Sequence, residues 1–152
     1  MDKDSPMTIF YDASCKLCSA EIEAIKLHDS ERQFIMVDCS AATFNDALYQ
    51  DDGITQKAMM NYLHVQNCSG EWFIGVDAFE LIYRTLGLSA AAWLWGSKVT
   101  RPVTSRLYPW IAKHRELISW SGLPYLFQLW GKCAARKAHK RSRRCVDGKC
   151  TL

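Results

Sequence analysis

A short apolar segment, Met7–Tyr11, is followed after three residues by two cysteines that stand three positions apart, Cys15 and Cys18. The apolar segment is rich in strand-forming residues, and the sequence from Cys15 to His28 is compatible with a helix. Side chains three positions apart lie on the same face of a helix, so the two sulfurs can meet across its first turn. This junction of strand, dithiol and helix constrains the fold more than any other feature of the chain.

The pattern after this junction predicts an α/β domain. We expect strands at 7–11, 34–37, 62–66 and 71–76, helices at 15–28, 40–50 and from 77 to Gly87, and one further helical turn at 55–59. Ser40 is the expected N-cap of the second helix, and Asp51-Asp52-Gly53 is its expected stop. Asp77 with Glu80 is the expected capping pair of the last helix. A parallel pair followed by an antiparallel hairpin and a closing helix is the thioredoxin-like layout, β-α-β-α-β-β-α.

The composition changes along the chain and suggests four parts. We expect an N-terminal tail at 1–6, the thioredoxin-like core at 7–87, a C-terminal helical extension at 88–130 and a basic, cysteine-containing tail at 131–152. Pro109 falls within a predicted helix of the extension. Because proline lacks the backbone N–H that a helix interior needs, we expect it to kink or split that helix.

Composition excludes several protein classes. The chain has 152 residues, of which 49% are apolar and 23% charged, and this suits a folded domain better than a disordered one. It has no run of about 18 apolar residues that would predict a membrane span, and its N-terminus is polar and acidic. We therefore expect a cytoplasmic protein, whose seven cysteines serve catalysis or metal binding and not a structural disulfide framework.

The charge is uneven along the chain. Residues 131–152 hold eight Lys/Arg and one Asp, and their net charge of +7 leaves −4 on residues 1–130. Basic residues suit nucleic acid, but there is no recognition motif and the rest of the chain is acidic, so we expect no nucleic-acid partner. Contact of this tail and the tryptophan-rich helices with a membrane surface is a weaker alternative. The sequence sets no oligomeric state.

The two cysteines have the spacing of a redox-active dithiol. Free N–H groups at the helix start, together with Lys16, would lower the pKa of Cys15 and raise its thiolate fraction. Because Cys15 lies nearer the solvent end of such a helix, we expect it to attack a protein or low-molecular-weight disulfide. We expect Cys18, one turn inward, to resolve the mixed disulfide, and no bound cofactor is required. Two roles stay open for Asp12: it could shape the turn or cap the helix, or it could accept the proton of Cys18.

The residues of this junction also resemble a known family. Tyr11-Asp12-x-x-Cys15-x-x-Cys18 is similar to the Asp-Cys-Cys signature of the DCC family of thiol–disulfide oxidoreductases. The resemblance covers about residues 7–118 and implies a thioredoxin-like fold and dithiol exchange. Beyond the signature it continues at Asp38, 63–65, Gly70, 75–79 and 108–115.

Two positions depart from the patterns that the resemblance implies. Ala13 stands where the family usually has glycine. Thioredoxins also have a cis-proline beside the dithiol, ahead of the third strand, but this chain has no proline between Pro6 and Pro102. One of residues 59–61 must therefore occupy that place, and the docking of a substrate backbone there is an open question.

A second close cysteine pair, Cys145 and Cys150, lies in the basic tail. It could form a local disulfide and pass electrons to Cys15 and Cys18, or it could join them in a four-cysteine zinc site. It could equally have no joint role. Two alternatives to dithiol exchange follow: a metal-binding module without enzymatic activity, and an interaction adaptor whose dithiol senses redox state. We favour the oxidoreductase, with no metal ligand assigned.

Overall fold

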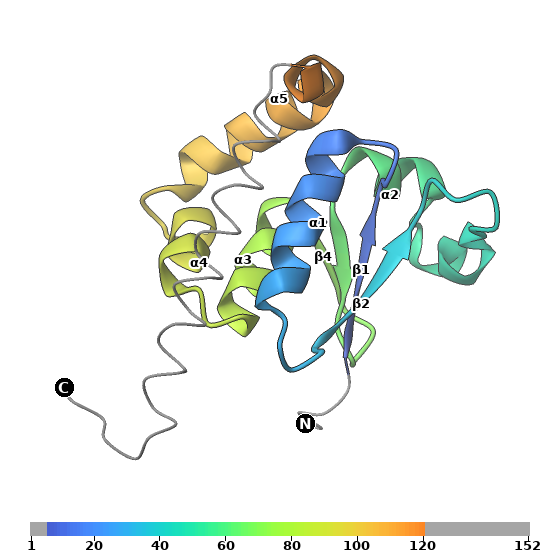
Figure 1. The fold of residues 1–152 in the computed structure, drawn as a ribbon, viewed down its shortest axis with the longest axis horizontal. Helices are drawn as coiled ribbons and strands as arrows, with labels where there is room; N and C mark the ends of the chain where they lie inside the picture. The colour runs from blue at the N-terminus through green and yellow to red at the C-terminus, as the bar shows by residue number, and fades with distance from the viewer. Residues whose placement is uncertain (1–5, 121–152) are drawn as a thin grey trace.

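The computed structural model describes residues 6–120 and has a four-stranded sheet at its centre (Figure 1). The strands are β1 (Met7–Tyr11), β2 (Phe34–Asp38), β3 (His64–Gln66) and β4 (Trp72–Ile74), in the order β2-β1-β3-β4. β1 is parallel to β2 and antiparallel to β3, and β3 is antiparallel to β4. A parallel pair needs a crossover connection, which α1 (Lys16–His28) provides. The predicted thioredoxin-like α/β fold is confirmed.

The other helices follow the order expected for this fold, with two more after the closing helix. They are the 3₁₀-helix η1 (Asp46–Asp52), α2 (Gln56–Asn61), α3 (Val76–Thr85), α4 (Ser89–Gly96) and α5 (Arg101–Trp120). The predicted strands at 62–66 and 71–76 are shorter in the structure, because pairing between β3 and β4 covers three residues of each strand. The predicted helix at 15–28 matches α1 closely.

Both faces of β1 are buried. Its neighbouring residues Ile9 and Phe10 are each 0% exposed and point to opposite faces of the sheet. Ile9 belongs to a core cluster with residues of α1, α3 and the two neighbouring strands: Ile22, Ile25, Phe34, Val65, Ala78 and Ile82. Phe10 belongs to a second cluster with Cys39, Ile54 and Met59. Burial of one such large apolar side chain is worth about 1.5–3 kcal/mol, so the end of β1, where Asp12 begins the next loop, has a well-defined place.

The helix predicted at 40–50 is wrong. The backbone N–H and the hydroxyl of Ser40 both donate to the carboxylate of Asp38, so this serine is held in a turn and does not cap a helix. The helix that does form is η1, which begins only after Asn45, whose side chain accepts from the N–H of Ala47. It ends at Gly53, as predicted, in the left-handed conformation.

The capping pair predicted for the helix at 77 is also wrong. α3 begins at Val76, and Gly75 precedes it without a side-chain capping bond. Asp77 therefore lies inside the first turn, where its carboxylate pairs with Arg101 of α5. An acidic side chain in this turn is still favourable, because it lies near the positive end of the helix dipole.

α5 runs through Pro109 without being split (Figure 1). Figure 1 shows the helix changing direction along its length, which is the bend expected where a proline removes an interior hydrogen bond. The later part of α5 passes over the N-terminal end of α1, close to the dithiol. Among residues 6–120, no helix combines the length and apolar character needed to cross a membrane.

Candidate active site

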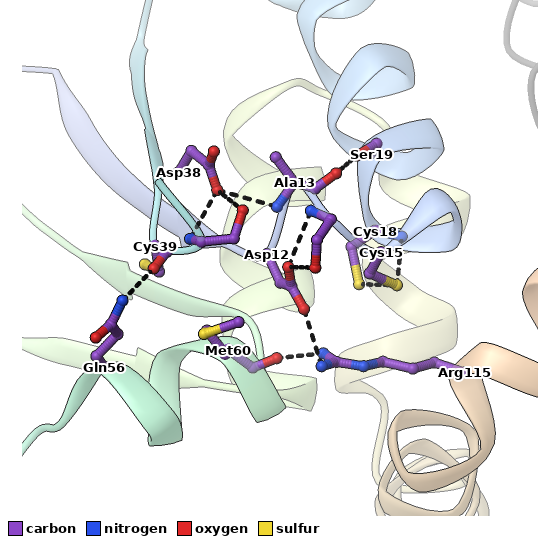
Figure 2. Close-up of polar contacts among 12 residues, drawn as sticks. Asp12, Ala13, Cys15, Cys18, Ser19, Asp38, Cys39, Gln56, Met60 and Arg115 are labelled. Carbon is purple, nitrogen blue, oxygen red and sulfur yellow. Dashed lines mark hydrogen bonds and ion pairs between the residues drawn. The ribbon is translucent and has the colours of Figure 1, made fainter. Parts of the chain in front are cut away.

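The dithiol lies at the junction of β1 and α1, where the sequence places it. Cys15 is the N-cap residue of α1, and its sulfur accepts a hydrogen bond of 3.3 Å from the backbone N–H of Cys18. The thiol of Cys18 also donates to the sulfur of Cys15, and the two sulfurs are 2.8 Å apart (Figure 2). This distance is longer than a disulfide bond of about 2.05 Å, so the structure describes the dithiol form.

The pKa values of the two thiols are shifted in opposite directions. The hydrogen bond from Cys18 lowers the pKa of Cys15 to about 6, with help from backbone N–H groups and the Arg115 cation, although burial acts against it. The same hydrogen bond raises the pKa of Cys18, as do burial and the negative charge of Cys15. A thiol with a pKa of about 6 is roughly nine-tenths thiolate at pH 7. Near neutral pH, Cys15 is therefore mostly a thiolate, whereas Cys18 keeps its proton.

Neither cysteine is fully open to solvent. Cys15 is 8% exposed, and Cys18 is half-buried. The place of Cys15 at the helix start suggested that it would be the more exposed of the two, but as a whole residue it is the less exposed. Assignment of Cys15 as the nucleophile therefore depends on its electrostatic environment and not on its exposure.

Asp12 is 3% exposed, and both of its carboxylate oxygens have partners. One oxygen accepts from the backbone N–H of Ser14 at 3.0 Å and from its hydroxyl at 2.5 Å. The other oxygen pairs with the guanidinium of Arg115 at 2.9 Å. These contacts support the turn-shaping role of Asp12. Its role as proton acceptor for Cys18 stays a prediction.

Arg115 is the residue of this site to which sequence reasoning assigned no role. It comes from α5, a hundred positions after Cys15, and its side chain is 18% exposed. Besides pairing with Asp12, the guanidinium donates to the backbone carbonyl of Met60, in the segment expected to replace the cis-proline. Arg115 supplies the cation that lowers the pKa of Cys15, the part that we had expected of the exposed Lys16.

A second carboxylate holds the loop that leads into the dithiol. Asp38, at the end of β2, accepts from the N–H of Ala13 at 3.1 Å and from the N–H and hydroxyl of Ser40 at 2.8 and 2.6 Å. Burial opposes ionisation, but these hydrogen bonds outweigh it and lower the pKa of Asp38. Ala13 has a negative φ, so alanine fits where the resemblance implied glycine.

The family assignment agrees with this geometry. The sequence model of the DCC1-like thiol-disulfide oxidoreductase family matches residues 9–121, a span that contains the dithiol, Asp12 and Arg115. The chain belongs to this family. The comparison with curated proteins and the comparison with solved structures found no match. Membership of the DCC1-like family supports thiol–disulfide oxidoreductase activity in general terms.

The remaining cysteines lie outside this centre or outside the described residues. Cys39 is buried against the sulfur of Met59 at 3.7 Å, and burial raises its pKa to about 12. Cys145 and Cys150 lie outside the described residues, so the local disulfide and the shared zinc site remain open alternatives for this pair. Within residues 6–120, no group of three or more His, Cys, Asp or Glu side chains is arranged to hold a metal ion.

Proposed function

We propose that this DCC1-like protein carries out thiol–disulfide exchange, with Cys15 as the attacking thiolate and Cys18 as the resolving thiol. The observation that carries the proposal is the hydrogen bond from the Cys18 thiol to the sulfur of Cys15, at 2.8 Å, on the N-cap residue of α1. It stabilises a thiolate on one sulfur and keeps the proton on the other. It also places the second sulfur where it must be to form a disulfide.

The reaction proceeds in two steps. The Cys15 thiolate attacks one sulfur of the substrate disulfide, a mixed disulfide forms, and the other substrate sulfur leaves as a thiolate that takes up a proton. Cys18 then loses its proton and attacks the sulfur of Cys15. The substrate's second thiol is released, and the Cys15–Cys18 disulfide remains. A low-molecular-weight or protein dithiol returns the two electrons and regenerates the starting form.

In this cycle the main role of Asp12 is to hold the dithiol loop in place. Its contacts with Ser14 and Arg115 hold the loop between β1 and α1. One carboxylate oxygen of Asp12 is paired with the Arg115 guanidinium and the other accepts from Ser14, so proton transfer from Cys18 to Asp12 would have to accompany a loosening of these contacts. The anchoring role needs no such change.

The test is turnover of a disulfide-bonded substrate such as insulin, with dithiothreitol as electron donor. We expect Cys15→Ser to lower the rate at least about 100-fold, and Cys68→Ser, at an exposed and isolated thiol, to leave it unchanged. Cys18→Ser should accumulate substrate in disulfide linkage to Cys15, in the tryptic peptide that ends at Lys16. Turnover that survives loss of Cys15, or a mixed disulfide on another cysteine, would overturn the proposal.

A further inference from the structure

Arg115 of α5 is largely buried and contacts other parts of the chain, unlike a solvent-exposed arginine on a helix surface. One of its terminal nitrogens is 2.9 Å from a carboxylate oxygen of the buried Asp12, and the other donates to the carbonyl of Met60. These contacts come from the loop after β1 and from the end of α2, so the guanidinium joins three parts of the chain (Figure 2). The planar group makes both contacts at once, which a lysine ammonium could not do in the same way.

The charges at this site are unbalanced in the dithiol form. Asp12 and the Cys15 thiolate are both negative, and Arg115 is the cation that acts on Cys15 and on Cys18. When Cys15 and Cys18 form a disulfide, the thiolate charge disappears, whereas the pair between Asp12 and Arg115 can remain. Arg115 therefore pairs with Asp12 in both redox states. In the reduced state it has a second negative partner, the Cys15 thiolate.

We propose that Arg115 is a positioning residue that favours the reduced dithiol over the disulfide, by stabilising the Cys15 thiolate from a place that Asp12 and Met60 fix. This inference rests on the proposed function, because it concerns the equilibrium of the same dithiol. It makes α5 part of the redox centre. A dithiol whose reduced form is stabilised has a disulfide that oxidises its partners more readily.

Opposite effects of two substitutions separate this role from a merely structural one. Arg115→Gln removes the cation, so it should destabilise the Cys15 thiolate and favour the disulfide. Asp12→Asn removes the competing anion but keeps an oxygen that can accept from Ser14, so it should stabilise the thiolate and favour the dithiol. Both variants break the same ion pair. If the pair only held the loop in shape, both would shift the equilibrium in the same direction.

The experiment equilibrates the full-length protein in glutathione buffers, blocks free thiols, and quantifies the Cys15–Cys18 disulfide by mass spectrometry of tryptic peptides. Arg115→Gln should lower the equilibrium constant for reduction about tenfold, which is about 30 mV toward a more negative potential. Arg115→Lys should recover part of that loss, because the charge remains. Lys113→Gln, at an exposed position of the same helix, should leave the constant unchanged.

Loss of Arg115 leaves the buried Asp12 without its cationic partner, and a buried carboxylate without a cation can prevent folding. The double variant Arg115→Gln/Asp12→Asn avoids this, and compared with Asp12→Asn alone it should show the same tenfold loss. Equal shifts for Arg115→Gln and Lys113→Gln, or shifts of the same sign for Arg115→Gln and Asp12→Asn, would overturn the inference. These measurements do not depend on turnover, so failure of the proposed function appears separately, as an inactive wild-type protein or a trap on another cysteine.

Discussion

The backbone N–H of Leu63, just before β3, donates a hydrogen bond of 2.9 Å to the hydroxyl of Tyr108, which lies on α5. The ring of the same tyrosine lies against Gly75, the residue before α3. One side chain of α5 thus contacts the residues that flank both strands of the β3–β4 hairpin. Together with Arg115, it attaches α5 to the end of the sheet at which the dithiol lies.

Gly75→Ala should therefore destabilise the protein more than an ordinary glycine substitution. Gly75 has a φ of +62°, and a Cβ there would lie 2.9 Å from the Tyr108 ring. Gly53, with a φ of +73° and no atom within 4 Å of its Cβ position, is the matched control. We expect a loss of about 1–2 kcal/mol for Gly53→Ala from backbone strain. The loss for Gly75→Ala should be at least about 1 kcal/mol more, from overpacking and from a ψ of −117° that lies outside the left-handed helical region of Gly53. Urea denaturation measures both, and equal losses would contradict the packing of Tyr108 on Gly75.

The carboxyl group of Glu21 should make stability fall as the pH rises. Burial raises the pKa of Glu21, and the hydroxyl of Tyr83, which donates to this carboxylate, offsets part of the rise. A raised carboxyl pKa means that the folded state holds its proton more tightly than the unfolded state does. The contribution of Glu21 to the free energy of unfolding is therefore most favourable below the ordinary glutamate pKa of about 4.3 and falls as pH rises through the higher folded pKa.

Glu21→Gln removes this ionisation and should flatten the dependence, so that the variant gains stability relative to wild type between pH 4 and pH 8. Urea midpoints across this range are the measurement. Glu23→Gln, at an exposed position on the same helix, should leave the slope unchanged. Parallel pH profiles for wild type and Glu21→Gln would show that Glu21 titrates alike in both states.

Asp38 should have the opposite dependence. Three hydrogen bonds to its carboxylate outweigh burial and lower its pKa, so its contribution is complete above the unfolded pKa of about 3.9 and is lost as pH falls through the lower folded pKa. We expect Asp38→Asn to cost about 1–2 kcal/mol near pH 7, because the amide oxygen can still accept these hydrogen bonds but carries no charge, and bonds to a charged acceptor are stronger. The cost should shrink below pH 4. Asp51→Asn, at an exposed position in η1, should cost little at any pH, and a similar loss there would argue against a special role for Asp38.

Sequence reasoning succeeded where the relevant interactions are local. The strand before Asp12, the N-cap position of Cys15 and the stop at Gly53 all follow from residues within one or two turns of each other. The helix expected at 40–50 failed although the competing contact is also local, because Asp38, only two positions earlier, takes both donors of Ser40. A capping pattern alone does not reveal that competition.

The part of the site that could not be predicted comes from α5. Arg115 reaches Asp12 across about a hundred positions, and Tyr108 reaches Leu63 across 45. Neither residue has a local pattern that distinguishes it from other aromatic or basic residues of a helix. The family resemblance included residues 108–115 but gave them no role. Long-range ion pairs and hydrogen bonds of this kind depend on the packed fold.

Truncation after Gly131 should leave the chemistry of Cys15 and Cys18 largely intact. A zinc site shared with the tail would need Cys145 and Cys150 as ligands, whereas the described groups that act on Cys15 and Cys18 lie between Asp12 and Arg115. Metal analysis of the reduced full-length and truncated proteins, beside insulin turnover, is the measurement. One tightly bound zinc that disappears with the tail, together with loss of turnover, would favour the metal-binding module.

The most direct test of the central claim is the alkylation rate of each thiol of the dithiol against pH, in the reduced wild-type protein. Trypsin cleaves after Lys16, so Cys15 and Cys18 fall in separate peptides and can be quantified independently by mass spectrometry. We predict that Cys15 reacts with a midpoint at about pH 6, and that Cys18 stays far less reactive through neutral pH. A Cys15 that titrates near 8.5 like a free thiol, or that reacts no faster than Cys18, would contradict the assignment of nucleophile and resolving thiol.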